Sequence, residues 1–121
     1  AFEDLETIKK GFIGYKGRVH VHYGLPCKIA NIGAENLAAD IDDQIFCGYR
    51  LFPSNIVAWQ MLYDSLDVTE LKHFWPDEDW FVAHAKFEKR IEALPEKHRD
   101  IVVQAYASPV TDQLSSSHHR A

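Results

Sequence analysis

Apolar residues recur every three to four positions over most of the chain, which is the spacing of amphipathic helices. Phe2, Leu5, Ile8 and Phe12 are a clear example, because they fall on one face of a helix. Residues 111–121 are polar and rich in serine, and we expect them to be a disordered tail. The spacing predicts helices at residues 2–13, 34–47, 55–65, 69–74, 78–93 and 96–107.

Residues 18–23 follow a different pattern, in which apolar and polar side chains alternate as they do along a β-strand. Gly24 and Pro26 follow directly and are expected to end the strand. Because a lone strand is not stable in water, it needs a partner that the rest of the chain barely supplies. We therefore predict an α+β fold that is mainly α, with four to six helices and one or two strands. One face of the strand would carry Val19, Val21 and Tyr23, and the other would carry Arg18, His20 and His22.

Residues with special backbone preferences mark where the helices begin and end. Gly48 fits the left-handed position that commonly follows a helix. Ser54 and Asp77 are the expected N-caps of the next two long helices, because their side-chain oxygens accept from free N–H groups. Ser108 and Pro109 are expected to end the last helix, since proline disfavours helical geometry at the residue before it.

The composition bounds the classes of function open to the chain. Its 121 residues are enough for one domain with a modest core, and 46% of them are apolar. The net charge of −5 argues against a nucleic-acid partner and against electrostatic docking on anionic lipid, because both select for basic surfaces. No apolar run approaches the roughly 20 residues of a membrane-spanning helix.

Two cysteines and the histidine pair on the strand are the side chains best suited to a metal. Cys27 and Cys47 stand in a chain without secretory features, so we expect reduced thiols in the cytosol. With His20 and His22 they would make a zinc set, but their spacing matches no standard zinc motif. The sequence favours a solvent-facing or partly buried histidine pair, and we predict no metal.

Four stretches of the chain resemble a known family. The pattern Gly-x-Val-x-Val-x-Tyr-Gly-x-Pro at residues 17–26 resembles the last core strand of the glycerolipid acyltransferases, enzymes that acylate lysophospholipids. Residues 38–45 and 49–55 resemble the helix and turn that follow this strand in a bacterial branch of the family. Residues 106–110 resemble the end of a C-terminal extension in the same branch. The resemblance implies the end of an α/β core followed by a helical extension.

The catalytic motif of that family is missing from this chain. It consists of a histidine, four residues and an aspartate, and the histidine is the general base for the acceptor hydroxyl. No histidine here has an aspartate five positions on; His73 and Glu78 come closest, but glutamate is not aspartate. Leu25 stands where the family commonly has an acidic residue and Cys27 where it has a branched aliphatic one. The resemblance therefore implies a parent chain that is an enzyme and a segment that is inactive alone.

The resemblance also implies three parts: residues 1–33 as a remnant of the acyltransferase core with its last strand, 34–110 as a helical C-terminal domain, and 111–121 as the tail. The parent would move an acyl group from acyl-CoA or acyl carrier protein to a lysophospholipid such as 1-acylglycerol-3-phosphate. It would be cytoplasmic and peripheral to the inner face of the cytoplasmic membrane. The segment would hold no cofactor, would have its own N-terminal catalytic core as partner, and would meet the membrane only through the parent.

Arg50 is the candidate substrate-binding residue, because it is the one cation of the turn at residues 49–55. Its guanidinium would either bind a lipid phosphate through two N–H groups or pair with an acidic side chain of the preceding helix. The sequence leaves both roles open.

An alternative function is a small helical protein-interaction or regulatory module without an enzymatic parent. Its support is the aromatic content of 12%, because aromatic side chains are favoured at protein interfaces.

The unpaired strand at residues 18–23 would expose its backbone edge, so self-association as a homodimer is also expected.

Overall fold

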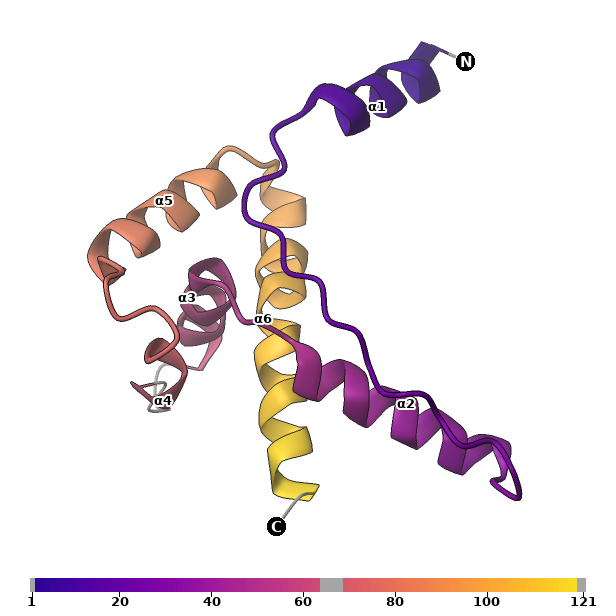
Figure 1. The fold of residues 1–121 in the computed structure, drawn as a ribbon. Helices are drawn as coiled ribbons and strands as arrows, with labels where there is room; N and C mark the ends of the chain where they lie inside the picture. The colour runs from indigo at the N-terminus through magenta and orange to yellow at the C-terminus, as the bar shows by residue number, and fades with distance from the viewer. Residues whose placement is uncertain (1, 64–68, 120–121) are drawn as a thin grey trace.

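Six helices follow one another along the described part of the chain, residues 2–63 and 69–119 of a computed structural model (Figure 1). No β-strand is present in those ranges. The predicted mainly helical class is therefore confirmed, whereas the predicted strand at 18–23 is wrong. The helices are α1 (Phe2–Ile13), α2 (Ala34–Gly48), α3 (Pro53–Leu62), α4 (Thr69–Lys72), α5 (Trp80–Glu92) and α6 (Glu96–His119).

The hydrophobic core lies where α3 packs against both α5 and α6. α3 buries Ile56, Val57 and Trp59, which point in different directions around the helix, as expected when other elements enclose it. α5 turns one stripe toward α3, and Phe87 and Ile91 on that stripe are buried, as their spacing predicts. α6 completes the core with Val103, Ala107 and Val110.

α6 is longer than the sequence predicts, because it passes through Pro109 and continues to His119. The expected helix end at Ser108 is therefore wrong. Residues 111–119 of the expected tail belong to α6 in the structure. The last two residues of the expected tail lie outside the described part of the chain.

Tertiary packing explains why α6 continues past its proline. A proline inside a helix costs about 3 kcal/mol, since it removes a backbone hydrogen bond and crowds the preceding turn. The continuation buries Val110 completely and packs Leu114 against the core. Full burial of one such side chain contributes about 1.5–3 kcal/mol, so the contacts made after Pro109 are large enough to offset its cost.

The N-terminal part of the chain stays outside the core. Residues 14–33 form a segment, here called the arm, that runs alongside α2 in the opposite direction (Figure 1). The arm has no neighbouring strand in the described chain, and Val19, Val21 and Tyr23 are exposed. Local alternation favours an extended backbone, but a strand also needs a partner backbone, which alternation cannot supply.

The observed helix starts differ slightly from the predicted caps. α3 begins at Pro53, so Ser54 lies inside its first turn. Asp79 rather than Asp77 caps α5, and its carboxylate accepts a hydrogen bond from an N–H of the first turn at 3.1 Å. The predicted division after residue 33 coincides with the start of α2, and its meaning as a domain boundary stays a prediction.

Gly48 is the last residue of α2 and does not adopt the predicted left-handed conformation. The His22 ring lies over this glycine instead, and a Cβ at this position would collide with the ring unless the exposed His22 side chain moved. His22 of the arm thus packs directly on the backbone at the end of α2. The residues that do take positive φ are Gly17 and Asn31, both in the arm.

Candidate functional site

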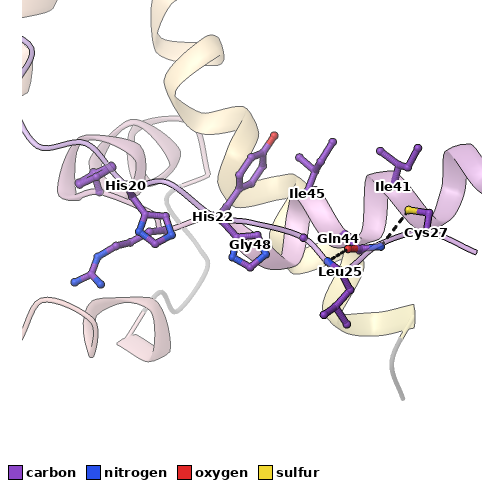
Figure 2. Close-up of a pocket in the computed structure, with 12 residues that line it drawn as sticks. His20, His22, Leu25, Cys27, Ile41, Gln44, Ile45 and Gly48 are labelled. Atoms are coloured by element: carbon purple, nitrogen blue, oxygen red, sulfur yellow. Dashed lines mark hydrogen bonds between the residues drawn. The ribbon is translucent and has the colours of Figure 1, made fainter.

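A cavity of about 560 Å³ lies between the arm, α2 and the turn that follows α2 (Figure 2). Apolar side chains of the arm and of α2 line it together with polar side chains of the arm and the turn. We call it the arm pocket; its lining includes His20, His22, Leu25, Ile41, Ile45 and Arg50. The structure therefore brings together Arg50 and the histidine pair, the candidate residues that the sequence suggests.

One side chain of α2 fastens the arm over the arm pocket. Gln44 Oε1 accepts a hydrogen bond from the backbone N–H of Leu25 at 2.7 Å, and its Nε2 lies 3.5 Å from Cys27 Sγ (Figure 2). Nε2 also donates to Asp40 Oδ2 at 3.3 Å, which orients the amide. The Gln44 amide thus links Asp40 of α2 to Leu25 and Cys27 of the arm. It fixes how the arm is aligned along α2.

The Cys27 thiol, beside this amide, is held in its neutral form. Partial burial raises its pKa above the ordinary value, and the Asp40 carboxylate raises it further, because a nearby negative charge disfavours the thiolate. The Gln44 amide acts in the opposite direction with a smaller effect. Since the thiolate is the form that attacks electrophiles and binds metals, Cys27 is poorly suited to either role at neutral pH.

The four side chains of the zinc alternative do not come together. His20, His22 and Cys27 line the arm pocket, but Cys47 faces α6, where its Sγ lies 3.8 Å from Ser116 Oγ. Among the described residues, no group of three or more histidine, cysteine or acidic side chains is arranged to hold a metal ion. Both histidines of the pair are exposed.

Trp75 organises two arginines beside the arm pocket. Its indole N–H donates to the Leu51 carbonyl at 2.7 Å, which fixes the ring. The guanidinium carbons of Arg18 and Arg50 lie 4.4 and 5.0 Å from ring centroids of Trp75. Stacking occupies the face of a guanidinium and leaves its edge N–H donors for an anion.

Arg50 does not form the predicted ion pair with an acidic side chain of α2. No salt bridge of Arg50 is present within the described chain, and its side chain is exposed. Of the two roles that the sequence leaves open, pairing with the preceding helix is therefore replaced by stacking on Trp75. Its N–H donors remain suited to bind a phosphate group.

A second cavity, of about 660 Å³, lies where the start of the arm meets α3, α5 and α6. Four cations line it, two from the arm and two from α5, with a single carboxylate, that of Glu78. This concentration of positive charge contrasts with the net charge of −5 of the whole chain. We call it the basic pocket; its lining includes Lys16, Arg18, Glu78, Lys86, Arg90 and Tyr106.

Sequence reasoning misses the basic pocket. The spacing on α5 places Lys86 and Arg90 on its solvent face, where they are indeed exposed, but it says nothing of what lies opposite. Lys16 and Lys86 are 70 positions apart, so no local pattern connects them. Only the path of the arm across the helices joins the two pairs of cations.

The histidine that comes closest to the missing catalytic motif has a different position. His73 packs against the ring of Phe74, with 3.9 Å between ring centroids. It lines neither the arm pocket nor the basic pocket, whereas Glu78 lines the basic pocket. The two residues therefore do not share a cavity in which an acceptor hydroxyl could bind.

Comparison with known proteins adds no family. No family model matches the chain, and neither the curated proteins nor the solved structures compared with it give a match. Among the described residues, no helix combines the length and apolar character needed to cross a membrane.

Proposed function

We propose that the chain is the C-terminal, non-catalytic part of an acyltransferase that moves an acyl group from acyl-CoA or acyl carrier protein to a lysophospholipid such as 1-acylglycerol-3-phosphate. In this function the arm pocket holds the acyl chain of the lipid. The observation that carries the proposal is the combination of apolar side chains and Arg50 in one cavity.

The arm pocket has the size and lining of a lipid site. Small-molecule sites in proteins occupy about 300–1,000 Å³ and are mostly apolar with a few polar groups, and the arm pocket occupies about 560 Å³. Leu25, Ile41 and Ile45 line it while remaining 80%, 41% and 46% exposed. An acyl chain that covered them would gain about 25 cal/mol for each Å² of apolar surface removed from water.

Arg50 supplies the polar end of the site. Its stacking on Trp75 orients the guanidinium, and its edge donors suit the phosphate of 1-acylglycerol-3-phosphate. The family's base, a histidine followed five positions on by an aspartate, is missing, and although His20 and His22 line the arm pocket, neither is paired with a carboxylate among the described residues. The chain therefore binds the acceptor lipid without activating its hydroxyl.

The arm offers support for a parent chain. Residues 18–23 have the alternation of a strand and yet no strand partner in the described chain. Their backbone groups are available to extend the edge of another sheet, which is a common mode of chain addition. The catalytic core of the parent would supply that sheet, and its own His and Asp would perform the chemistry.

Lipid binding by the whole chain tests the proposal. We expect saturable binding of 1-acylglycerol-3-phosphate, and weaker binding of a monoacylglycerol of the same chain length, which lacks the phosphate. The affinity for each lipid is measured by titration below its critical micelle concentration, with tryptophan fluorescence as the signal. Trp75 lies beside Arg50, so its fluorescence should respond to a bound lipid.

Two variants and a control separate the parts of the arm pocket. Arg50→Gln should abolish the preference for the phosphorylated lipid, and Ile45→Asn should weaken binding of both lipids. Lys97→Gln removes a charge from the exposed surface of α6 and should change neither. Equal affinity for the two lipids in the unsubstituted chain, or no saturable binding, would contradict the proposal.

The second candidate is a small helical interaction or regulatory module without an enzymatic parent. One observation favours it: the core consists of residues from position 51 to 110, and no arm residue belongs to it. A helical body of this kind needs no outside sheet to be stable. Failure of the lipid titration, together with a monomeric state of the chain in solution, would favour this second function.

A further inference from the structure

In the basic pocket, the fold brings four positively charged side chains together. Lys16 and Arg18 come from the arm, and Lys86 and Arg90 are one turn apart on α5. Like charges at this spacing on a helix repel, and the arm adds two more at the same cavity. An arrangement of this kind is stabilised by an anion that lies between the cations.

The chain does not neutralise these cations itself. None of the four forms a salt bridge within the described residues, and Glu78 is the single carboxylate of the lining. Lys16 donates to the backbone carbonyl of Gly11, which uses one of its three donors. Most of the hydrogen-bonding capacity of the pocket is therefore free for a ligand.

Two of the cations are already oriented. Arg90 Nη1 lies 3.3 Å from the hydroxyl of Tyr106, and the Tyr106 ring packs edge-on against Phe87, which is 3% exposed. Arg18 is held over the Trp75 ring, 4.4 Å from its centroid. Anchoring of this kind lowers the entropy lost when a ligand binds.

We propose that the basic pocket binds a phosphorylated ligand, through a phosphate monoester or diphosphate group that Lys86 and Arg90 contact directly. Guanidinium and ammonium groups are the usual protein partners of phosphate, with arginine binding it through paired N–H donors. The volume of about 660 Å³ suits a small molecule of which the phosphate is one part. The proposal does not rest on the proposed function, because it concerns a different cavity and different cations.

The test is titration of the whole chain with inorganic pyrophosphate, measured by calorimetry. We expect saturable binding that weakens as salt is added, since the contacts are exposed charges. Lys86→Gln should reduce the affinity about tenfold, which is the usual effect of losing a hydrogen bond to a charged group. Lys89→Gln is the matched control, because it removes the same charge from the same helix outside the basic pocket.

A second arm of the experiment distinguishes the source of the phosphate. Vesicles of phosphatidylcholine with and without phosphatidic acid present the same group as a lipid headgroup. Binding of pyrophosphate supports a soluble ligand, and binding to the phosphatidic acid vesicles alone supports a lipid headgroup. In each case the effect of Lys86→Gln must exceed that of Lys89→Gln.

Two results would overturn the proposal. One is that neither pyrophosphate nor the phosphatidic acid vesicles bind saturably at concentrations of about 1 mM. The other is an equal loss in Lys86→Gln and Lys89→Gln, which would show attraction by general surface charge. Circular dichroism of each variant verifies that its helices are intact, and Lys86 is exposed, so its replacement leaves the core unchanged.

Discussion

The backbone N–H of Leu25 donates a hydrogen bond to Gln44 Oε1 at 2.7 Å, and this contact ties the arm to α2. The arm contributes nothing to the hydrophobic core, so its position over the arm pocket depends on a few polar contacts of this kind. The same amide also reaches Cys27 and Asp40. The arm and α2 thus form one unit around the cavity to which we assign lipid binding.

Replacement of Gln44 by alanine should release the arm without unfolding the helices. The lost hydrogen bond is worth about 0.5–1.5 kcal/mol, so amide exchange at Leu25 should become about tenfold faster. Exchange in α3 should not change. Hydrogen exchange measured by NMR is the assay, and Gln104→Ala, at an exposed site on α6, is the control. Unchanged exchange at Leu25 would show that other contacts hold the arm.

The two phenylalanines of α5 should differ sharply in their effect on stability. Phe87 is 3% exposed and Phe81 is 85% exposed. Phe87→Ala should lower the free energy of unfolding by about 3–5 kcal/mol, because it leaves a cavity in the core. Phe81→Ala should change it by about 0.5 kcal/mol or less. Urea unfolding measures both, and similar losses for the two variants would contradict the assigned faces of α5.

Pro109→Ala tests whether α6 continues to His119. If it does, alanine removes the proline penalty of about 3 kcal/mol, which combines a lost hydrogen bond with crowding of the preceding turn, less about 1 kcal/mol for the greater freedom of the unfolded chain. The free energy of unfolding should therefore rise by about 2 kcal/mol. Thermal unfolding measures the change. A variant no more stable than the unsubstituted chain would instead agree with a helix that ends near Ser108.

The Cys27 thiol should react slowly with alkylating reagents in mildly alkaline solution. Partial burial and the Asp40 carboxylate raise its pKa above the ordinary value, so less thiolate is present at any given pH. Asp40→Asn removes the negative charge, lowers the pKa and should accelerate alkylation. Mass spectrometry after reaction with iodoacetamide distinguishes Cys27 from Cys47, whose rate is the internal reference. An unchanged rate at Cys27 would show that burial alone sets its reactivity.

The chain alone should transfer no acyl group from acyl-CoA to 1-acylglycerol-3-phosphate. The reason is the missing His–Asp pair, since the family relies on it to activate the acceptor hydroxyl. Transfer of a labelled acyl group by the pure protein is the assay. Turnover that His73→Ala abolishes would contradict this prediction and would make His73 a catalytic residue.

The sequence by itself determined the elements whose signals are local. The apolar spacing of Phe2, Leu5 and Ile8 places α1, and that of Phe87 and Ile91 defines the buried stripe of α5. These predictions succeed because residues three and four apart share a helix face whatever surrounds them. The candidate side chains of the arm pocket were also named from sequence, because histidine, cysteine and arginine carry recognisable chemistry.

The tertiary structure decided what depends on distant partners. The alternation at residues 18–23 needed a second strand to become a sheet, and the described chain has none. Pro109 was expected to end a helix, but the contacts of Val110 and Leu114 with the core offset the cost of the proline. Gly48 does not adopt a positive φ, and its close neighbour is the side chain of His22, 26 positions earlier in the sequence.

The basic pocket marks the same limit for function. Lys16 and Lys86 belong to segments whose local patterns predict only solvent exposure, and they share a cavity because the start of the arm lies beside α5 and α6. The spacing of apolar residues indicates which face of a helix is buried, because burial requires an apolar face. The spacing of charged residues does not indicate what lies opposite them, because exposed positions tolerate many side chains. The helices were therefore readable from sequence, and the placement of the charged side chains was decided by the fold.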